Sequence, residues 1–516
     1  MKKTKEYIIL FILLIFACFL RLWIISTLQF NAFNSDQIIP ALMAKHIAEG
    51  KNFPIFYYGQ SFFGALESYL IAIFFYFFGF KPCLIYYINI LLSTFNILIE
   101  YILIKFLFGR KIALLSIFLV AIPPKELFLL SYNPGCSVFS NFLQLLNIFL
   151  FVKIYYSQRV PIKSFLLFFA ISGLLFWVWH IYIPVFFLLI IILLMKQRTI
   201  NKKLFYLGIL FFLFCSSPLW VYNLINNGKT FYEIFGKFTA VDLLENKNIL
   251  HIFKDFIFHR IWSRNFYFSC WLKAIGGENP ILFIMIITGI ILVLFKVKLY
   301  FFNRKTIFPP ITLLLFLAVV FFIIGHRHTR YLTILIFLII PCSVVGLSFC
   351  LPYYLKKLLV ILVVVTNIFI LFVGIKTSIF SSPMKWNEII NTLFLNKLFY
   401  GYSDYWYSYP ITFLTNEKII VSPILPESNG EICDRYPKYT ELVRQQKQVF
   451  ILVPCNSPIQ KKVVKIVKDY PIPNIKNFYS PCCTLYWPIE PSHPLYKEVL
   501  LRQYYKIKNK YYYKNK

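Results

Sequence analysis

Asp36 has the residue type and the position best suited to chemistry in this chain. It lies in the segment Asn34-Ser35-Asp36-Gln37, directly after the first long apolar stretch, residues 7–28. Acidic residues are scarce, with 21 Asp plus Glu against 53 Lys plus Arg in 516 residues. A carboxylate at the point where a membrane helix leaves the bilayer is a candidate for function. The chemistry it could perform is proton acceptance as a general base.

A structural role for Asp36 is the alternative. Ser35 and Asp36 precede the segment Gln37 to Glu49, which is predicted to be helical, and both residue types are favoured helix caps. The sequence leaves the two roles open. A second group of polar side chains follows soon after, in the run Phe56-Tyr57-Tyr58-Gly59-Gln60-Ser61 and at Glu67.

The composition places these residues in a membrane protein. Hydrophobic residues make up 59% of the chain and charged residues 14%, whereas about a quarter of a soluble chain is charged. Apolar runs long enough to cross a ~30 Å hydrocarbon core recur along the first 375 positions. The net charge of +32 lies mostly in short clusters between these runs, so it indicates membrane topology and not nucleic-acid binding.

The clusters of Lys and Arg predict the topology. Lys2, Lys3 and Lys5 precede the first span, so we expect a cytoplasmic N-terminus, and five internal clusters are placed on the same side. About eleven spans follow, near 7–28, 84–104, 112–130, 137–152, 164–180, 181–195, 204–224, 280–295, 306–325, 331–350 and 357–375. The fold class is therefore an all-α polytopic membrane bundle. Because the number of spans is odd, the tail from Lys376 lies outside.

The segment Phe62 to Phe80 is apolar enough to span, but counting it would move the cluster at 105–111 to the wrong side. We expect it to form an interfacial or partly re-entrant helix on the outer face. The chain then divides into a multi-spanning domain, 1–375, with a catalytic first outer loop at 29–83, and an extracytoplasmic domain, 376–516.

This topology collects the polar residues of interest on the outer side. They are Asp36, Gln60, Glu67, Lys125, Glu126, Tyr132, Asn133, His180, Asp242, Glu245, Asp255, His259, Arg260, Arg264 and Glu278. The outer turn Gly325 to Arg330, with His326, Arg327, His328 and Arg330, departs from the positive-inside bias. Such a cluster suits a phosphate or pyrophosphate lipid headgroup. General attraction to anionic lipids is the alternative.

The tail from Lys376 to Lys516 has a different character. Lys418 to Val421 and Gln448 to Val453 are predicted strands, and Pro458 to Asp469 is a predicted amphipathic helix. A small mixed α/β domain is the expected fold. It contains Cys433, Cys455, Cys482 and Cys483, which could form one disulfide in an oxidising compartment. The chain contains no zinc-ligand spacing, P-loop, dinucleotide fingerprint or GxSxG elbow.

The order of these features resembles a known family. An acidic residue follows the first span, then come Tyr57-Tyr58-Gly59-Gln60 and a span that closes on Lys105-x-x-x-Gly109-Arg110-Lys111. Further similarities are the segments Ser217 to Asn223, Arg330-Tyr331-Leu332 and Ser403-Asp404-Tyr405-Trp406. This chain is similar to GT-C membrane glycosyltransferases, in the group of dolichyl-phosphate-mannose protein mannosyltransferases and aminoarabinose transferases (family 39 and relatives).

The resemblance implies that Asp36 is the catalytic base. Relatives often have a paired acidic motif, whereas Gln37 follows Asp36 here. The departure puts a metal in doubt, so we expect no cofactor and no metal. The implied reaction is inverting transfer of a hexose or pentose from a polyprenyl-phosphate donor. A single carboxylate can catalyse one displacement as general base, whereas a retaining mechanism needs two about 5 Å apart.

We therefore expect substrate contacts at six positions, and the expected acceptor is a glycan, lipid or protein. The positions are Tyr58, Gln60, Glu67, His326, Arg327 and Arg330. Glu67 would be structural or would orient the acceptor, and Arg327 and Arg330 would hold the leaving phosphate. The expected location is the cell membrane, with membrane lipid as a partner and no nucleic acid.

Two other classes of protein compete with the transferase. A transporter or lipid flippase would also explain the spans and the basic outer turn. However, transporters tend to have internal repeats with broken spans at matching places, and the sequence has no such symmetry. A non-catalytic assembly or receptor protein is the third reading.

Overall fold

The computed structural model describes residues 3–27, 34–132, 135, 137–196, 201–234, 277–300, 314, 317, 333–380, 386–426, 432–455, 457–479 and 482–501. The chain forms two compact units. The first comprises Met1–Trp23, Ser61–Leu66 and Tyr86–Ile375, and the second comprises Ile24–Gln60, Glu67–Ile85 and Lys376–Lys516. The first loop therefore belongs with the tail by its contacts. The predicted division into 1–375 and 376–516 stays a prediction.

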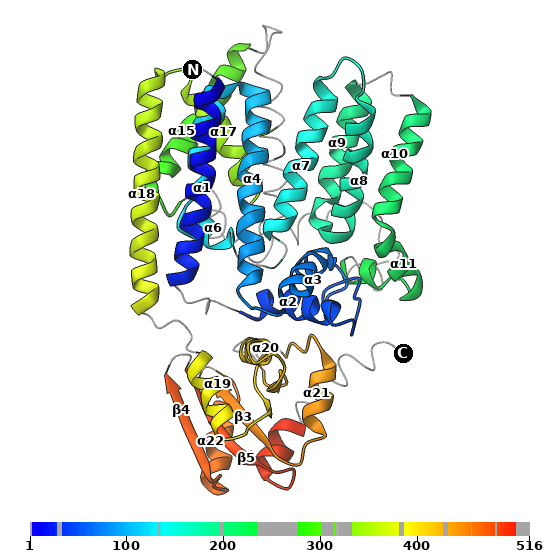
Figure 1. The fold of residues 1–516 in the computed structure, drawn as a ribbon, viewed down its shortest axis with the longest axis vertical. Coiled ribbons are helices and arrows are strands. Elements are labelled where there is room, and N and C mark those ends of the chain that lie inside the picture. The colour runs from blue at the N-terminus through cyan, green and yellow to red at the C-terminus, as the bar shows by residue number, and fades with distance from the viewer. Residues whose placement is uncertain are drawn as a thin grey trace, which may run out of the picture. The chain divides into compact units, whose positions relative to one another are not determined.

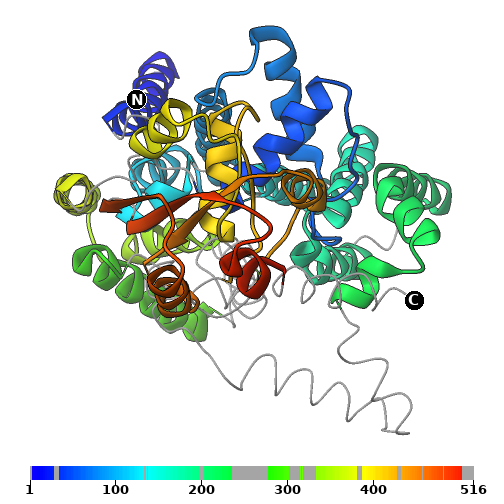
Figure 2. The same ribbon diagram turned by 90° about the horizontal axis from the view of Figure 1, so that it is seen from below.

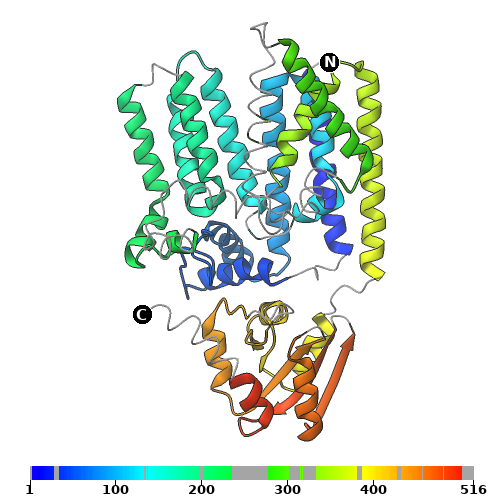
Figure 3. The same ribbon diagram turned by 180° about the vertical axis from the view of Figure 1, so that it is seen from behind.

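The first unit is built from apolar helices, several of which run side by side (Figures 1 and 3). Its helices are α1 (Lys3–Thr27), α4 (Leu84–Phe108), α5 (Arg110–Ala121), α6 (Lys125–Leu130), α7 (Ser137–Tyr156), α8 (Ile162–Val178), η1 (His180–Tyr182), α9 (Ile183–Lys196), α10 (Lys202–Cys215), α11 (Ser217–Ile225), α15 (Pro280–Tyr300), α17 (Leu335–Leu347) and α18 (Tyr353–Phe380).

Within the described residues, four helices are long and apolar enough to cross a membrane, or five if the bent pair α10 and α11 forms one span. Ten of the eleven predicted spans coincide with described helices. The span predicted at 306–325 lies outside the described residues, apart from 314 and 317. The predicted helical membrane bundle is confirmed as a mostly helical fold, and the count of about eleven spans stays a prediction.

Two predicted spans are broken by proline. The 112–130 span separates into α5 and α6 at Pro123-Pro124, and the 204–224 span bends by 58° between α10 and α11, next to Pro218. Proline lacks the N–H that a helix interior requires, so the helix ends or kinks there. The carbonyl freed at Ile122 accepts a hydrogen bond from Nδ2 of Asn367 at 2.8 Å.

The second unit combines two helices of the first loop with a mixed sheet. Its elements are α2 (Ser35–Ala48), α3 (Leu66–Phe78), α19 (Trp386–Leu395), β1 (Tyr400–Tyr402), α20 (Tyr405–Leu414), β2 (Ile420–Ser422), α21 (Pro437–Arg444), β3 (Val449–Pro454), α22 (Gln460–Asp469), β4 (Asn474–Tyr479), β5 (Cys482–Ile489) and η4 (Tyr496–Leu501). The strand order is β2-β1-β3-β5-β4. Figure 2 shows the orange and red strands of this sheet from below. β1 is parallel to β2 and β3, whereas β5 is antiparallel to β3 and β4.

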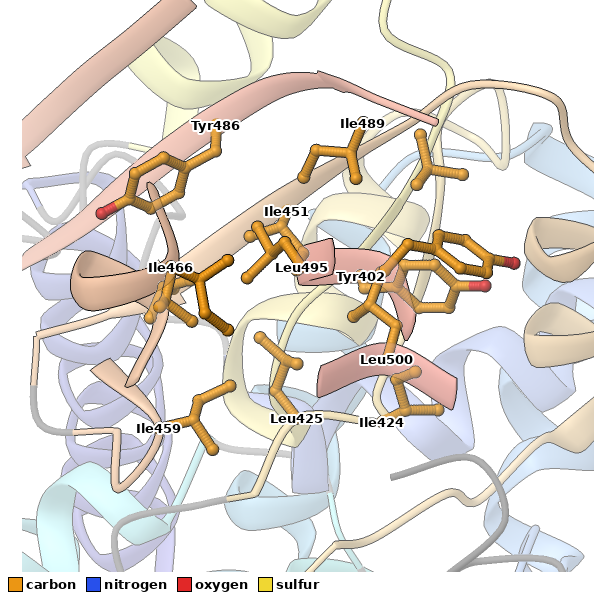
Figure 4. Close-up of a cluster of buried hydrophobic side chains, with 14 of the residues drawn as sticks. Tyr402, Ile424, Leu425, Ile451, Ile459, Ile466, Tyr486, Ile489, Leu495 and Leu500 are labelled. Atoms are coloured by element: carbon orange, nitrogen blue, oxygen red, sulfur yellow. The ribbon is translucent and has the colours of Figure 1, made fainter. Parts of the chain in front are cut away.

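The central strand β3 contributes side chains to a hydrophobic core on each face of the sheet. Its six residues are all buried, as expected for a central strand covered on both sides. Val449, Ile451 and Val453 pack in one hydrophobic cluster with α22 and η4 (Figure 4). Phe450 and Leu452 point to the other face and pack in a second cluster with α19 and α20.

The small α/β fold predicted for the tail is confirmed. β2, β3 and α22 lie where the sequence predicts two strands and a helix. Among the four candidate cysteines, Cys455 and Cys482 form a disulfide. The predicted helix between Phe62 and Phe80 is present as α3, and its position at the membrane surface stays a prediction.

Candidate functional site

The start of α2 separates the two roles considered for Asp36. Asn34 is the helix cap: its Oδ1 accepts a hydrogen bond from the Gln37 backbone N–H at 3.0 Å. The Gln37 side chain in turn accepts one from the Asn34 N–H at 3.2 Å. This reciprocal capping box satisfies two backbone donors. Asp36 lies in the first helical turn, so its carboxylate is available for another role.

Asp36 contacts the tail segment of the same unit. Its Oδ1 accepts a hydrogen bond from the hydroxyl of Tyr405 at 2.7 Å. The neighbouring Ser35 hydroxyl donates to the Tyr405 carbonyl. Burial raises the pKa of Tyr405 well above its ordinary value, and the negative charge of Asp36 adds to that shift. Tyr405 therefore remains protonated and presents a fixed donor to Asp36.

Arg435 joins Tyr405 to the predicted Tyr57-Tyr58-Gly59-Gln60 segment. Its guanidinium carbon lies 5.7 Å from the centre of the Tyr405 ring, and its Nη1 donates to the Gly59 carbonyl at 3.0 Å. With the Gln60 amide oxygen assigned toward Arg435 from the local hydrogen bonds, it accepts from Nη1 at 3.0 Å and Nη2 at 2.9 Å. Asp36, Tyr405, Arg435 and Gln60 thus form one connected group.

Gly59 is required for this arrangement. Its φ is +67°, a conformation that glycine adopts without steric cost. A Cβ atom at this position would lie 2.8 Å from Cδ and 3.0 Å from Cα of Arg435. The glycine therefore permits close approach of the loop to the arginine.

Asp434 shapes the loop that presents Arg435. Its carboxylate accepts hydrogen bonds from the Thr440 hydroxyl at 2.7 Å and the Tyr436 N–H at 3.2 Å. The Tyr409 hydroxyl lies 3.4 Å from the same carboxylate and accepts from the Arg435 N–H at 2.7 Å. Burial raises the pKa of Asp434 to about 6, against the opposing effect of these hydrogen bonds.

A second polar group, the Glu417 network, comprises Lys45, His46, Tyr58, Glu417 and Tyr439. Glu417 pairs with Lys45, accepts from Nε2 of His46 at 3.0 Å and accepts from the Tyr439 hydroxyl at 2.8 Å. The Tyr58 hydroxyl lies 2.9 Å from Nδ1 of His46. Lys45 and His46 are 4% and 2% exposed, so their polar groups depend on these partners.

The charge of Glu417 is stabilised by its partners. Burial alone would raise the pKa of Glu417, but the hydrogen bonds from His46 and Lys45 outweigh it and hold the pKa well below its ordinary value. The network therefore contains an ionised carboxylate at neutral pH. It joins α2, which carries Asp36, to the turn between α20 and β2.

The structure distributes the predicted site residues over three groups. Asp36 and Gln60 lie together with Tyr405 and Arg435. Tyr58 belongs to the Glu417 network, where Asn52 also donates to its hydroxyl at 3.2 Å. Glu67 is buried and accepts from the Tyr57 hydroxyl at 2.8 Å. His326, Arg327 and Arg330 lie outside the described residues.

Two members of the site were not predicted from the sequence. Tyr405 carries a signal only as part of the Ser403 to Trp406 segment, which is similar to the family. Arg435 has no local signal, because its role depends on contacts with Gly59 and Gln60, about 375 residues earlier in the chain.

In the described part of the chain, no three His, Cys, Asp or Glu side chains lie close enough together to hold a metal ion. The neighbours identified beside Asp36 are a phenol and a guanidinium, and the latter's positive charge opposes a bound cation. Among the described residues, those beside Asp36 offer no set of metal donors, and the expectation of metal-free chemistry stays a prediction.

The chain is similar to known membrane glycosyltransferases. Residues 65–222 match the family described as dolichyl-phosphate-mannose-protein mannosyltransferase. ArnT from Cupriavidus metallidurans, in a structure bound to undecaprenyl phosphate, has a TM-score of 0.53 at 10% identity, covering 90% of this chain and 97% of ArnT. No curated protein sequence matches the chain.

An oligosaccharyltransferase from Archaeoglobus fulgidus, in complex with Zn and sulfate, is also similar. Its TM-score is 0.53 at 13% identity, covering 88% of this chain and 69% of the transferase. The same transferase tethered to an acceptor peptide gives a TM-score of 0.52 at 12% identity, covering 87% and 69%. At these identities the structural matches establish the fold. Together with the family match, they confirm the resemblance to GT-C membrane glycosyltransferases that the sequence indicates.

Proposed function

We propose that this chain is a membrane glycosyltransferase of the cell membrane that transfers a sugar from a polyprenyl-phosphate donor to an extracytoplasmic acceptor. The observation that carries the proposal is the placement of Asp36 in the first turn of α2, where Tyr405 holds its carboxylate. The fold shared with ArnT and the oligosaccharyltransferase supports the same class of reaction. The donor is lipid-linked, as the undecaprenyl phosphate bound to ArnT suggests.

The proposed mechanism is a single displacement. Asp36 accepts the proton of the acceptor hydroxyl or amine as that group attacks the anomeric carbon. The new glycosidic bond forms while the bond from carbon to the phosphate oxygen breaks, and the phosphate leaves with the electron pair. The configuration at the anomeric carbon is inverted. Glu67 is buried with Tyr57 as a partner, which supports a structural role for it.

A transfer assay with sealed vesicles tests both the reaction and the side of the membrane on which it takes place. Right-side-out vesicles that contain the protein and a labelled polyprenyl-phosphate sugar should glycosylate an acceptor added from outside. The proposed orientation places the N-terminus in the cytoplasm and the catalytic loop and tail outside. Transfer confined to inside-out vesicles would contradict that orientation. Movement of the labelled lipid between leaflets without any transfer would favour the flippase reading.

Arg330 and Arg327 are the proposed contacts of the donor phosphate, with His326 and His328 as lesser contributors. Arg330→Ala should weaken donor binding by roughly 10- to 100-fold, because it removes a charge-assisted contact of about 1.5–3 kcal/mol. Arg330→Lys should restore only part of the affinity, since a point charge lacks the bidentate geometry. Equilibrium titration with the donor measures both. Unchanged affinity in Arg330→Ala would move the assignment to Arg260 and Arg264.

Tyr405 is the proposed positioning residue for Asp36. Tyr405→Phe keeps the ring beside Arg435 but removes the hydroxyl that donates to Asp36. We expect kcat to fall about tenfold, the equivalent of one charge-assisted hydrogen bond of about 1.5 kcal/mol, with the KM for the donor unchanged.

Tyr407→Phe is the matched control for this experiment. Tyr407 lies on the same helix, and its hydroxyl donates to the Cys482 carbonyl at 3.1 Å. This variant should retain normal kcat. If Tyr405→Phe and Tyr407→Phe had the same kinetics, Tyr405 would have no role in positioning the base.

A further inference from the structure

Asp434 is a carboxylate of the second unit that takes no part in the proposed displacement. It lies in the loop before α21, directly before Arg435. Its Oδ2 accepts from the Thr440 hydroxyl at 2.7 Å, and its Oδ1 accepts from the Tyr436 N–H at 3.2 Å. The Tyr409 hydroxyl lies 3.4 Å from the same Oδ1. These donors are neutral, and none of the ion pairs between described residues includes Asp434.

The hydrogen bonds of Asp434 reach the residues beside the proposed base through a short chain of contacts. The Tyr409 hydroxyl, which donates to Asp434, accepts from the N–H of Arg435 at 2.7 Å. The guanidinium of Arg435 lies 5.7 Å from the centre of the Tyr405 ring. The hydroxyl of Tyr405 in turn donates to Asp36. The backbone held by Asp434 therefore determines where the arginine lies beside the site.

A purely structural role would not require a charge at position 434. Asparagine has the same shape as aspartate, and its amide oxygen can accept the same backbone hydrogen bond. The Thr440 hydroxyl can turn to accept from the amide, because it also lies 2.8 Å from the Ser422 hydroxyl and either hydroxyl can donate. A partly buried carboxylate without a cationic partner costs free energy of folding. The charge of Asp434 thus lowers stability relative to an amide, which indicates a role in function.

The pKa of Asp434 reflects this cost. Burial raises the pKa from its ordinary value of 3.8 to about 6, and the charge of Glu441 on α21 adds to the increase, against the opposing hydrogen bonds. Tyr409 on α20 stays protonated, because burial and the charge of Asp434 raise its own pKa well above the ordinary value. A carboxyl with a raised pKa stabilises the fold only while it is protonated. That contribution is complete below pH 3.8 and is lost as the pH rises through about 6.

We propose that Asp434 is a positioning residue whose ionised carboxylate holds Arg435 beside Tyr405 and Asp36, so that transfer is fast only while Asp434 is charged. This role rests on the proposed function of Asp36 as the base. Hydrogen bonds to an ionised acceptor are roughly twice as strong as those to a neutral one. Protonation of Asp434 therefore weakens its hold on the loop N–H and on the Tyr409 hydroxyl, and the loop holds the arginine less firmly. The site would respond in this way to the acidity of its compartment.

The pH dependence of turnover tests this role. In the unaltered protein kcat should fall at least threefold between pH 7.5 and pH 5, with the KM for the donor unchanged. Asp434→Asn has no charge to lose, so its kcat should already be at least threefold lower at pH 7.5 and should change little below it. Asp469→Asn is the matched control, because it makes the same chemical change at an exposed position on α22. This control should follow the profile of the unaltered protein.

Two neighbours should move the midpoint of that profile in opposite directions. Thr440→Val removes a hydrogen bond that favours the ionised form of Asp434, so the midpoint should rise. Glu441→Gln removes a negative charge that disfavours it, so the midpoint should fall, with full kcat at pH 7.5. If Asp434→Asn does not fold, these variants decide the matter. An unchanged midpoint in both would overturn the proposal.

Melting temperatures separate positioning from support of the fold. At pH 7.5, Asp434→Asn should melt at or above the temperature of the unaltered protein, because it removes an unfavourable charge. The advantage should shrink at pH 5, where Asp434 is largely protonated. A structural role predicts a lower melting temperature at pH 7.5 and a kcat profile of unchanged shape. That combination would refute the proposal.

Hydrogen exchange follows the same loop without any transfer. The amides of Arg435 and Tyr436 both donate to the Tyr409 hydroxyl. Their protection, corrected for the intrinsic effect of pH on exchange, should decrease in the unaltered protein from pH 7.5 to pH 5. In Asp434→Asn it should be low throughout. Constant protection in the unaltered protein would overturn the proposal, whereas the expected exchange pattern without any transfer would contradict the proposed function instead.

Discussion

Asp36→Asn should fold normally and lose at least about 100-fold in turnover, because an amide cannot accept the proton of the attacking group. The amide oxygen can still accept the Tyr405 hydrogen bond, so the local geometry should persist. Asn34 caps α2, so the helix does not depend on the Asp36 side chain. Donor binding should survive, because the proposed phosphate contacts lie elsewhere. Single-turnover assays with a labelled donor, together with a donor titration, separate these effects.

Asp404→Asn is the control for this substitution. Asp404 caps α20 by accepting from the Tyr407 N–H at 3.1 Å, and Asn is nearly as good a cap as Asp. The same chemical change one residue before Tyr405 should therefore leave turnover near normal. A well-folded and fully active Asp36→Asn protein would remove the base assignment and direct attention to Glu67 and Glu126.

Glu417→Gln should lower the free energy of unfolding by about 3 kcal/mol. The change leaves the buried His46 without its carboxylate and leaves Lys45 with only Glu49, at 3.5 Å, and removal of one partner from a buried ion pair typically costs that much. The melting temperature in detergent should therefore fall by several degrees. Activity should decline with it, since α2 carries Asp36.

The stability that Glu417 contributes to the folded protein should decrease as the pH becomes acidic. The pKa of Glu417 is lowered in the folded protein, so its stabilising contribution is present above about pH 4.5 and is lost as the pH falls toward the folded value. The Glu417→Gln protein should lack this part of the acid sensitivity. Asn416→Gly is the control for the turn. Asn416 is exposed and, like Glu417, has a positive φ (54°), a conformation that glycine accommodates. A melting temperature equally lowered in both variants would point to the turn and not to the charges.

Hydrophobic patterning was sufficient to locate most of the helices. An apolar run of about 20 residues has few stable arrangements besides a helix in a membrane, and α1, α4 and α7 begin or end within a few residues of their predicted bounds. β3 was predicted for a related reason, because a short run of β-branched and aromatic residues between turn signals indicates a buried strand. These features depend on neighbours in the sequence.

The residues that contact Asp36 are distant from it in the sequence, so local sequence patterns do not predict these contacts. Tyr405 is 369 residues away, and its contact with Asp36 follows from the packing of α2 against α20. The sequence also left open whether Asp36 caps the helix or acts as a base, because Ser35 and Asp36 precede the helix and both residue types are good caps. The backbone decides it: Asn34 has the extended conformation of a cap, with φ −121° and ψ 167°.

The grouping of the first loop with the tail has a consequence for evolution and engineering. Asp36, Gly59 and Gln60 are encoded near the start of the chain, whereas Tyr405, Glu417 and Arg435 are encoded near its end. Each set supplies hydrogen-bond partners to the other. Chimeras that exchange the tail alone between relatives would mismatch these contacts. We therefore expect chimeras that exchange both segments together to fold and function far better than chimeras that exchange only one. The unit that must be exchanged as a whole is thus encoded by two separate parts of the gene.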